Sequence, residues 1–117
     1  MVTTTTNVTE EVLEQHIQAL VSRDLDRIVG DYADDAVIFA PNAVFKGLQS
    51  IRAFFKAGLE MLTPEAMDDL KFNRKAFEGE YAYVLWSAGK VVPFAGDLFR
   101  IRDRKIVIQS IVQQTSS

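Results

Sequence analysis

The chain has 117 residues, of which 48% are hydrophobic and 25% are charged, and this balance is typical of a globular protein. We expect one domain over residues 1–117, with an ordered core of about 8–113 and fraying ends at 1–6 and 114–117. Because it contains no cysteine and a single histidine, disulfide and thiolate chemistry are excluded, and neither a metal nor a cofactor is expected. A net charge of −3 argues against nucleic-acid binding. Because the sequence has no apolar run long enough to span a membrane and no signal-like start, it predicts a cytoplasmic protein with no membrane partner.

The first half of the sequence has the periodicity of helices. Asn7 or Thr9 is expected to cap a first helix, and His16 lies within its apolar stripe. Asp24 is expected to cap a short second helix. A third helix ends before Pro64, because the residue preceding a proline disfavours helical geometry. The predicted buried positions are Val12, Leu13, Ile17, Leu20 and Val21 in the first helix, Leu25, Ile28, Val29 and Tyr32 in the second, and Ile51, Phe54, Phe55, Leu59 and Leu62 in the third.

The second half of the sequence indicates strands, because apolar and polar side chains alternate between turn residues. The long strand at 91–102 is expected to bend near Pro93 or Gly96, since both residues weaken a strand. Asp103 and Arg104 are expected to form the last hairpin turn. Helices followed by hairpins indicate an α+β fold with the helices on one face of the sheet. The predicted strands are residues 36–40, 44–46, 70–77, 81–88, 91–102 and 105–113.

Two titratable residues are the candidates for catalysis. Alternation places Asp97 on the same strand face as Phe99 and Ile101, and burial among them would raise its pKa and suit it to act as a general acid. The alternative is an acid at a strand edge or the partner of an arginine. His16 is a candidate base, acid or polar anchor, and the alternative is a core histidine whose nitrogens are satisfied.

Apolar side chains at these spacings either line a ligand pocket or form ordinary core. Arg74, placed by alternation on the face of Phe72, and Arg52 are candidates for an anionic ligand group or for stems lying on the surface. The sequence contains no phosphate-binding glycine loop, dinucleotide fingerprint or metal-ligand cluster. The expected pocket residues are Tyr32, Ile38, Ala40, Phe54, Phe55, Met61, Phe72, Trp86 and Phe99.

Three groups of residues resemble the SnoaL-like and ketosteroid-isomerase-like families of the nuclear transport factor 2-like superfamily. They are RDLDRIVGDYADDAV at 23–37, FKG at 45–47 followed by IRAFF at 51–55, and DLFRI at 97–101 followed by KIV at 105–107. The resemblance implies a strongly bent antiparallel sheet wrapped around N-terminal helices, a cone-shaped, cystatin-like roll with a ligand pocket inside. It also implies a homodimer formed through the outer sheet face, where Phe94 and Leu98 would suit an interface.

The resemblance also bears on individual site residues. Ketosteroid isomerases place an oxyanion-binding tyrosine at the position of His16, and a supporting tyrosine at that of Phe55. Their proton-shuttling aspartate precedes a proline, where this chain has Ala40 and Pro41, so their reaction is not expected here. Their second aspartate, and the acid/base aspartate of SnoaL-like cyclases, match Asp97. Asp97 is likewise the one position that matches the Asp-Arg-Asp arrangement of the epoxide hydrolases in this superfamily.

Two functions follow as hypotheses. The first is a cofactor-free acid/base enzyme, an isomerase, cyclase or hydratase/hydrolase, in which Asp97 and His16 share or relay a proton on a small hydrophobic substrate. The second is a non-catalytic module that binds a hydrophobic ligand or dimerises, motivated by the missing base at Ala40.

Overall fold

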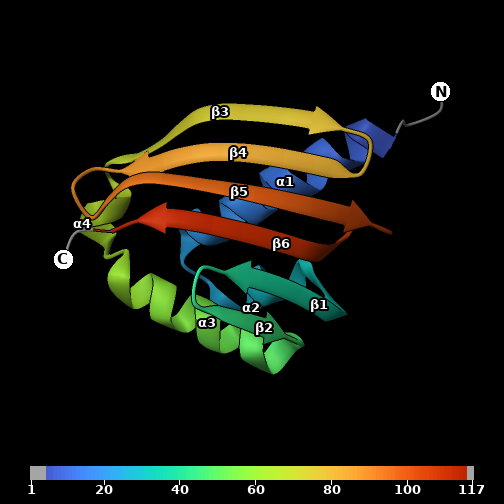
Figure 1. Ribbon diagram of the computed structural model, residues 1–117, viewed down its shortest axis with the longest axis horizontal. Helices are drawn as coiled ribbons and strands as arrows, with labels where there is room; N and C mark the ends of the chain where they lie inside the picture. Colours follow the sequence, from blue (N-terminus) through green and yellow to red (C-terminus); the bar gives the residue numbers. More distant parts are fainter. Residues whose placement is uncertain (1–4, 116–117) are drawn as a thin grey trace.

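In the computed structural model, which describes residues 5–115, helices pack on one face of a curved six-stranded sheet (Figure 1). The predicted α+β class is therefore confirmed. The helices are α1 (Thr5–Ser22), α2 (Leu25–Gly30), α3 (Leu48–Met61) and α4 (Pro64–Met67). The strands are β1 (Tyr32–Ala40), β2 (Ala43–Lys46), β3 (Leu70–Glu78), β4 (Tyr81–Ala88), β5 (Val92–Arg102) and β6 (Lys105–Gln114).

The strands are ordered β2-β1-β6-β5-β4-β3. Hairpins join β1 to β2 and connect β3 through β6, so these neighbours are antiparallel. One pairing differs from the expected antiparallel sheet, because β1 runs parallel to β6, the last strand in the sequence. We call the helix-covered side of the sheet its inner face and the opposite side its outer face.

The helices follow the predicted apolar stripes, with three differences at their ends. α1 begins at Thr5 and is not capped by Asn7 or Thr9; Thr9 lies inside the helix and donates its hydroxyl to the carbonyls of Thr5 and Gly79. Val21, predicted to be buried, is 52% exposed because it lies one step further round the helix than Ile17, which is at the edge of the buried stripe. Tyr32 belongs to β1 and not to the second helix, which ends at Gly30.

Caps and turns explain the other element boundaries. Asp24 caps α2 as predicted, accepting a hydrogen bond from the backbone N–H of Arg27. Thr63 caps the additional short helix α4, in which Pro64 occupies a first-turn position that needs no N–H donor. Asp103 and Arg104 both have positive φ, at 52° and 62°, which is the geometry of a two-residue hairpin turn.

Four register shifts interrupt the sheet, and two of them bear on the predicted directions of side chains. The register of β4 and β5 shifts beside Pro93, as predicted for the bend in that strand. A second shift falls between Phe72 and Arg74 in β3, and it was not predicted. Phe72 therefore pairs with Trp86 and lines the inner face, whereas Arg74 pairs with Leu85 and is exposed. The expectation that Arg74 shares the face of Phe72 is wrong, because a bulge reverses simple alternation.

The helices cover different parts of the inner face. α1 packs against β3, β4 and β5, while α3 packs against β1 and β2 at the other side of the sheet (Figure 1). The two helices diverge over the centre of the sheet, and the space between them is the site described below. No helix within residues 5–115 is long and apolar enough to cross a membrane.

Candidate functional site

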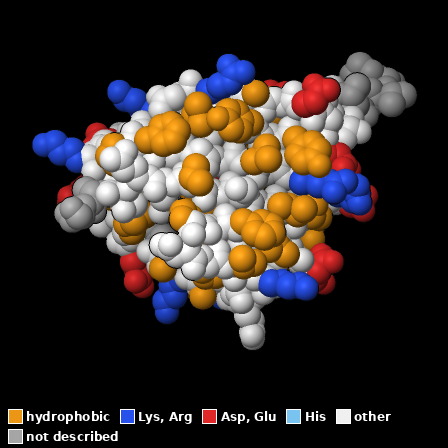
Figure 2. Space-filling view, in the orientation of Figure 1, with side chains coloured by type: hydrophobic (Ala, Val, Ile, Leu, Met, Phe, Trp, Pro, Cys, Tyr) orange, Lys and Arg blue, Asp and Glu red, His pale blue; other side chains and the backbone are white. Residues whose placement is uncertain are grey.

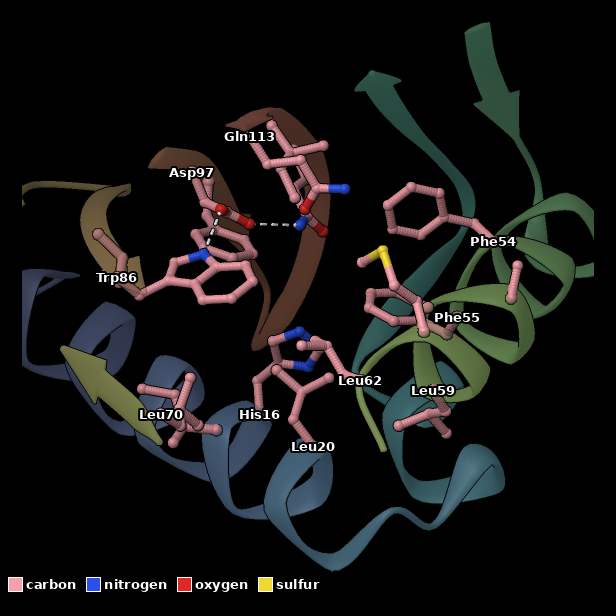
Figure 3. Close-up of a pocket in the computed structure, with 18 of the residues that line it drawn as sticks. His16, Leu20, Phe54, Phe55, Leu59, Leu62, Leu70, Trp86, Asp97 and Gln113 are labelled. Atoms are coloured by element: carbon pink, nitrogen blue, oxygen red, sulfur yellow. Dashed lines mark hydrogen bonds between the residues drawn. The ribbon is translucent and has the colours of Figure 1, made fainter. Parts of the chain in front are cut away.

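A cavity of about 370 Å³ lies between α1, α3 and the inner face of the sheet, which is within the size range of small-molecule sites (Figure 3). Its lining is almost entirely hydrocarbon, with four polar side chains contributed by α1, β5 and β6. The polar residues are His16, Asp97, Gln109 and Gln113. The apolar lining is Leu13, Ile17, Leu20, Phe45, Ala53, Phe54, Phe55, Ala57, Gly58, Leu59, Met61, Leu62, Met67, Leu70, Phe72, Val84, Trp86, Phe99 and Ile111.

The cavity also explains an incomplete burial of α3. Ile51 and Phe55 are buried as predicted, but Phe54, Leu59 and Leu62 keep part of their surface exposed. All three side chains line the cavity.

Asp97 is the buried acid of the site. It lies on the inner face of β5 with Phe99 and Ile101, as alternation predicted, and is 6% exposed. Its Oδ1 accepts a hydrogen bond from Trp86 Nε1 at 2.9 Å and its Oδ2 accepts one from Gln109 Nε2 at 2.8 Å (Figure 3). Burial raises the pKa of Asp97 from its ordinary 3.8 to about 6, and the two hydrogen bonds lower it against that larger effect.

His16 lies on α1 and is 1% exposed. Its Nδ1 is 3.0 Å from Oδ2 of Asp31, and its Nε2 is 3.3 Å from the hydroxyl of Tyr32. Gln15 donates to the other oxygen of Asp31 at 2.9 Å, which fixes that carboxyl group in place. Both nitrogens of the imidazole are thus occupied within the protein, and the ring packs edge-on against three aromatic neighbours.

Tyr32 and Gln109 join the histidine to the acid. The Tyr32 hydroxyl donates to Oε1 of Gln109, whose Nε2 donates to Asp97. The same Tyr32 oxygen lies 3.3 Å from His16 Nε2. Burial, and then the charges of Asp97 and Asp31, raises the pKa of Tyr32 well above its ordinary value, so the hydroxyl keeps its proton.

These hydrogen bonds place His16 and Asp97 in different surroundings. The route of hydrogen bonds from His16 to Asp97 passes through Gln109, whose amide group does not ionise. Asp97 itself lines the cavity, so its carboxyl group can contact a ligand there. Both nitrogens of His16 are engaged within the protein, so His16 makes no direct hydrogen bond to Asp97, and the expectation that the two residues share or relay a proton stays a prediction.

The structure brings most of the predicted site residues together. His16, Phe54, Phe55, Met61, Phe72, Trp86, Asp97 and Phe99 all line the cavity. Three predicted pocket residues lie elsewhere. Tyr32 is buried behind His16, Ile38 is fully buried core, and Ala40 ends β1 opposite Ala43.

The two candidate arginines also lie outside the cavity. Arg74 is exposed on the outer face, and Arg52 pairs with Asp26 at the surface at 2.7 Å. Within residues 5–115, no group of three or more histidine and acidic side chains is placed to hold a metal ion.

Sequence reasoning missed Asp31, Gln109 and Gln113. The two glutamines alternate with Ile111 on the last strand, and a polar residue in such an inner-face pattern is a signal that was available. Asp31 carries no such signal, because it follows α2 in a turn and reads like the neighbouring exposed acids Asp34 and Asp35.

Comparison with known proteins agrees with this architecture. A family model described as a SnoaL-like domain matches residues 13–109. An NTF-2 like protein of unknown function from Burkholderia xenovorans LB400 has a TM-score of 0.76 at 20% identity, over 94% of this chain and 85% of that one. A search of curated proteins by sequence finds no match.

Two further solved structures come from proteins described as enzymes. A putative ketosteroid isomerase from Kribbella flavida DSM 17836 has a TM-score of 0.74 at 16% identity, over 97% of this chain and 83% of that one. SalBIII, described as an epoxide hydrolase/cyclase-like enzyme with a role in pyran ring formation in the polyether salinomycin, has a TM-score of 0.74 at 15% identity, over 91% and 90% of the two chains. At these identities the likeness concerns the fold alone.

Proposed function

The chain belongs to the SnoaL-like domain family, and we propose that it is a cofactor-free acid/base enzyme that converts a small hydrophobic substrate at Asp97. The reaction classes that fit are isomerisation, cyclisation, and hydration or hydrolysis. One observation carries the proposal: a carboxyl group whose pKa is raised to about 6 stands in the wall of a hydrocarbon-lined cavity.

The pKa of Asp97 suits proton transfer in both directions. Near neutral pH both forms of the group are populated, so the carboxylate can accept a proton from a substrate and the acid can return one. The surrounding hydrocarbon lowers the local dielectric constant, which strengthens the electrostatic interactions of the carboxyl group with a bound substrate. Trp86 and Gln109 hold the carboxyl group in one orientation, an arrangement that favours a defined geometry of attack.

The test is turnover of two small apolar probes, styrene oxide for epoxide hydration and cyclohex-3-enone for double-bond migration. On a probe that is accepted, Asp97→Asn is expected to lower kcat/KM by about a hundredfold or more, because the proton-transferring group is lost. Asp103→Asn, at the exposed hairpin turn, is the matched control and should leave kcat/KM unchanged. Equal turnover by the unmodified protein and Asp97→Asn would show that the proposal is wrong.

A non-catalytic role in ligand binding is the second candidate. It is supported by the cavity lining, in which Asp97 is the one carboxyl group contributed by residues 5–115, and by the occupied nitrogens of His16. In that case Asp97 orients a ligand by hydrogen bonding, and its replacement changes affinity without abolishing any reaction.

We further propose that two copies of the chain pair through the outer face of the sheet. Large apolar side chains lie exposed there on neighbouring strands, among them Tyr83, Phe94, Leu98 and Val112 (Figure 2). Leu98 is directly opposite Tyr83, so the exposed side chains adjoin one another across strands. Large apolar side chains gathered on one exposed face are unfavourable in water and are typical of an interface.

A further inference from the structure

The last strand carries two glutamines beside the acid of the site. Asp97 on β5 lies directly opposite Ile111 on β6, and Gln109 and Gln113 are the residues two positions before and after Ile111. Because alternate residues of a strand point to the same face, both glutamines share the inner face with Asp97. Both line the cavity.

The two amides differ in what they are bonded to. Gln109 is 2% exposed and uses its oxygen for Tyr32 and its nitrogen for Asp97. Gln113 is half-buried, and within residues 5–115 its side chain makes no hydrogen bond. In the described chain, every fully buried side-chain polar atom has a hydrogen-bond partner. The amide of Gln113 has none, so its polar atoms are accessible from the space that the side chain lines. The amide of Gln113 therefore has a donor and an acceptor available for a ligand.

The opposite wall of the cavity offers no polar partner. It is formed by α3, whose lining side chains include Phe54, Phe55 and Leu59. Figure 3 shows Asp97 and Gln113 together on the strand side, with Phe54 and Phe55 across the cavity from them. A ligand in this space meets polar groups along one edge and hydrocarbon on the other.

We propose that Asp97 and Gln113 together form a two-point recognition site for a flat, apolar ligand with two hydrogen-bonding groups on one edge. Diagonal neighbours on adjacent strands are roughly 7–8 Å apart, which is about the distance between polar substituents at the two ends of a fused two-ring system. Gln113 is the specificity-determining residue, because Asp97 alone accepts any ligand with a single polar group. The inference rests on the proposed function only in placing the ligand in this cavity.

The test compares naphthalen-2-ol, which has one hydroxyl group, with naphthalene-2,7-diol, which has one on each ring along the same edge. Calorimetric titration at neutral pH gives the affinity of each probe for the unmodified protein, Gln113→Met and Gln114→Met. Methionine keeps the length of the side chain and removes its polar groups. Gln114 is the matched control, since it is the next residue and is exposed.

We expect the unmodified protein and Gln114→Met to prefer the diol by roughly tenfold, the effect of one additional hydrogen bond. Gln113→Met is expected to lose that preference while binding the mono-ol as before. Retention of the preference in Gln113→Met, or no preference or no binding in the unmodified protein, would overturn the inference. If Gln113→Met loses the preference for the diol and turnover of the apolar probes depends on Asp97, both proposals are confirmed. If the preference is lost in Gln113→Met but no turnover depends on Asp97, the proposed function alone is contradicted.

Discussion

Nδ1 of His16 lies 3.0 Å from Oδ2 of Asp31, and both side chains are buried, at 1% and 4% exposure. The histidine is held at Nδ1 by this pair and at Nε2 by Tyr32, so it serves as an anchor for the network that ends at Asp97. The site thus separates an anchoring group on α1 from the proposed proton-transferring group on β5.

The His16–Asp31 pair is expected to be strongly stabilising only as a pair. Asp31→Ala should lower the free energy of unfolding by about 3 kcal/mol, because it leaves a buried imidazole without a partner. His16→Leu combined with Asp31→Ala should cost less than the sum of the two single changes. Urea denaturation measures all three, with Asp34→Ala at an exposed position of β1 as the control. Additive costs would show that the two side chains do not depend on each other.

The raised pKa of Asp97 predicts a specific dependence of stability on pH. Because folding raises the pKa from 3.8 to about 6, the contribution of Asp97 to stability is fully present below pH 3.8 and is lost as the pH rises through about 6. Asp97→Asn stays neutral throughout. Its free energy of unfolding should therefore rise relative to the unmodified protein across that interval, by on the order of 2–3 kcal/mol. Urea denaturation at several pH values measures the difference, and a difference independent of pH would contradict the assignment.

Trp86 provides a direct report on the same ionisation. It is the single tryptophan of the chain, and its indole N–H donates to Asp97 Oδ1 at 2.9 Å. The fluorescence of Trp86 is expected to change with a midpoint near pH 6, as the carboxyl group beside it gains or loses charge. The same titration on Asp97→Asn should lack this step. A step that persists in Asp97→Asn would belong to another group and would contradict the assignment to Asp97.

Sequence patterns predicted the fold well because most elements are governed by local periodicity. The α1 stripe, the cap at Asp24 and the last hairpin turn all depend on residues close in the chain. Arg74 was misplaced because a bulge in β3 depends on the partner strand, and no local pattern indicates it. The parallel pairing of β1 with β6 likewise depends on the whole topology.

The site was predictable to a similar extent. Alternation placed Asp97 on the inner face, and helical spacing placed His16 there. The bonds of His16 to Asp31 and Tyr32 were not predictable, because they depend on the position of the chain after α2, where helical spacing no longer applies. Tyr32 was therefore assigned to the pocket lining when it lies one layer behind it.

Tyr32 is expected to influence Asp97 through Gln109. Tyr32→Phe removes the hydroxyl that holds the amide of Gln109, and the hydrogen bond from Gln109 lowers the pKa of Asp97. The midpoint of the Trp86 fluorescence titration should therefore rise by roughly 0.5–1 pH unit, the effect of a weakened hydrogen bond. Tyr83→Phe, on the outer face, is the matched control and should leave the midpoint unchanged. An unchanged midpoint in Tyr32→Phe would show that the network does not tune the acid.

The proposed dimer predicts a change of assembly from one substitution on the outer face. Leu98 is 43% exposed between Tyr83 on β4 and Ser110 on β6, at the middle of the exposed apolar surface. Leu98→Glu places a charge there, and a second copy would bury it opposite the same charge, so the dimer should dissociate. Val21→Glu, on the last turn of α1, makes the same change at an exposed site away from the sheet and should leave assembly intact. Sedimentation velocity over a range of concentrations measures the outcome. A strictly monomeric unmodified protein at the highest concentration would refute the dimer, and an unaffected dimer in Leu98→Glu would locate the interface elsewhere.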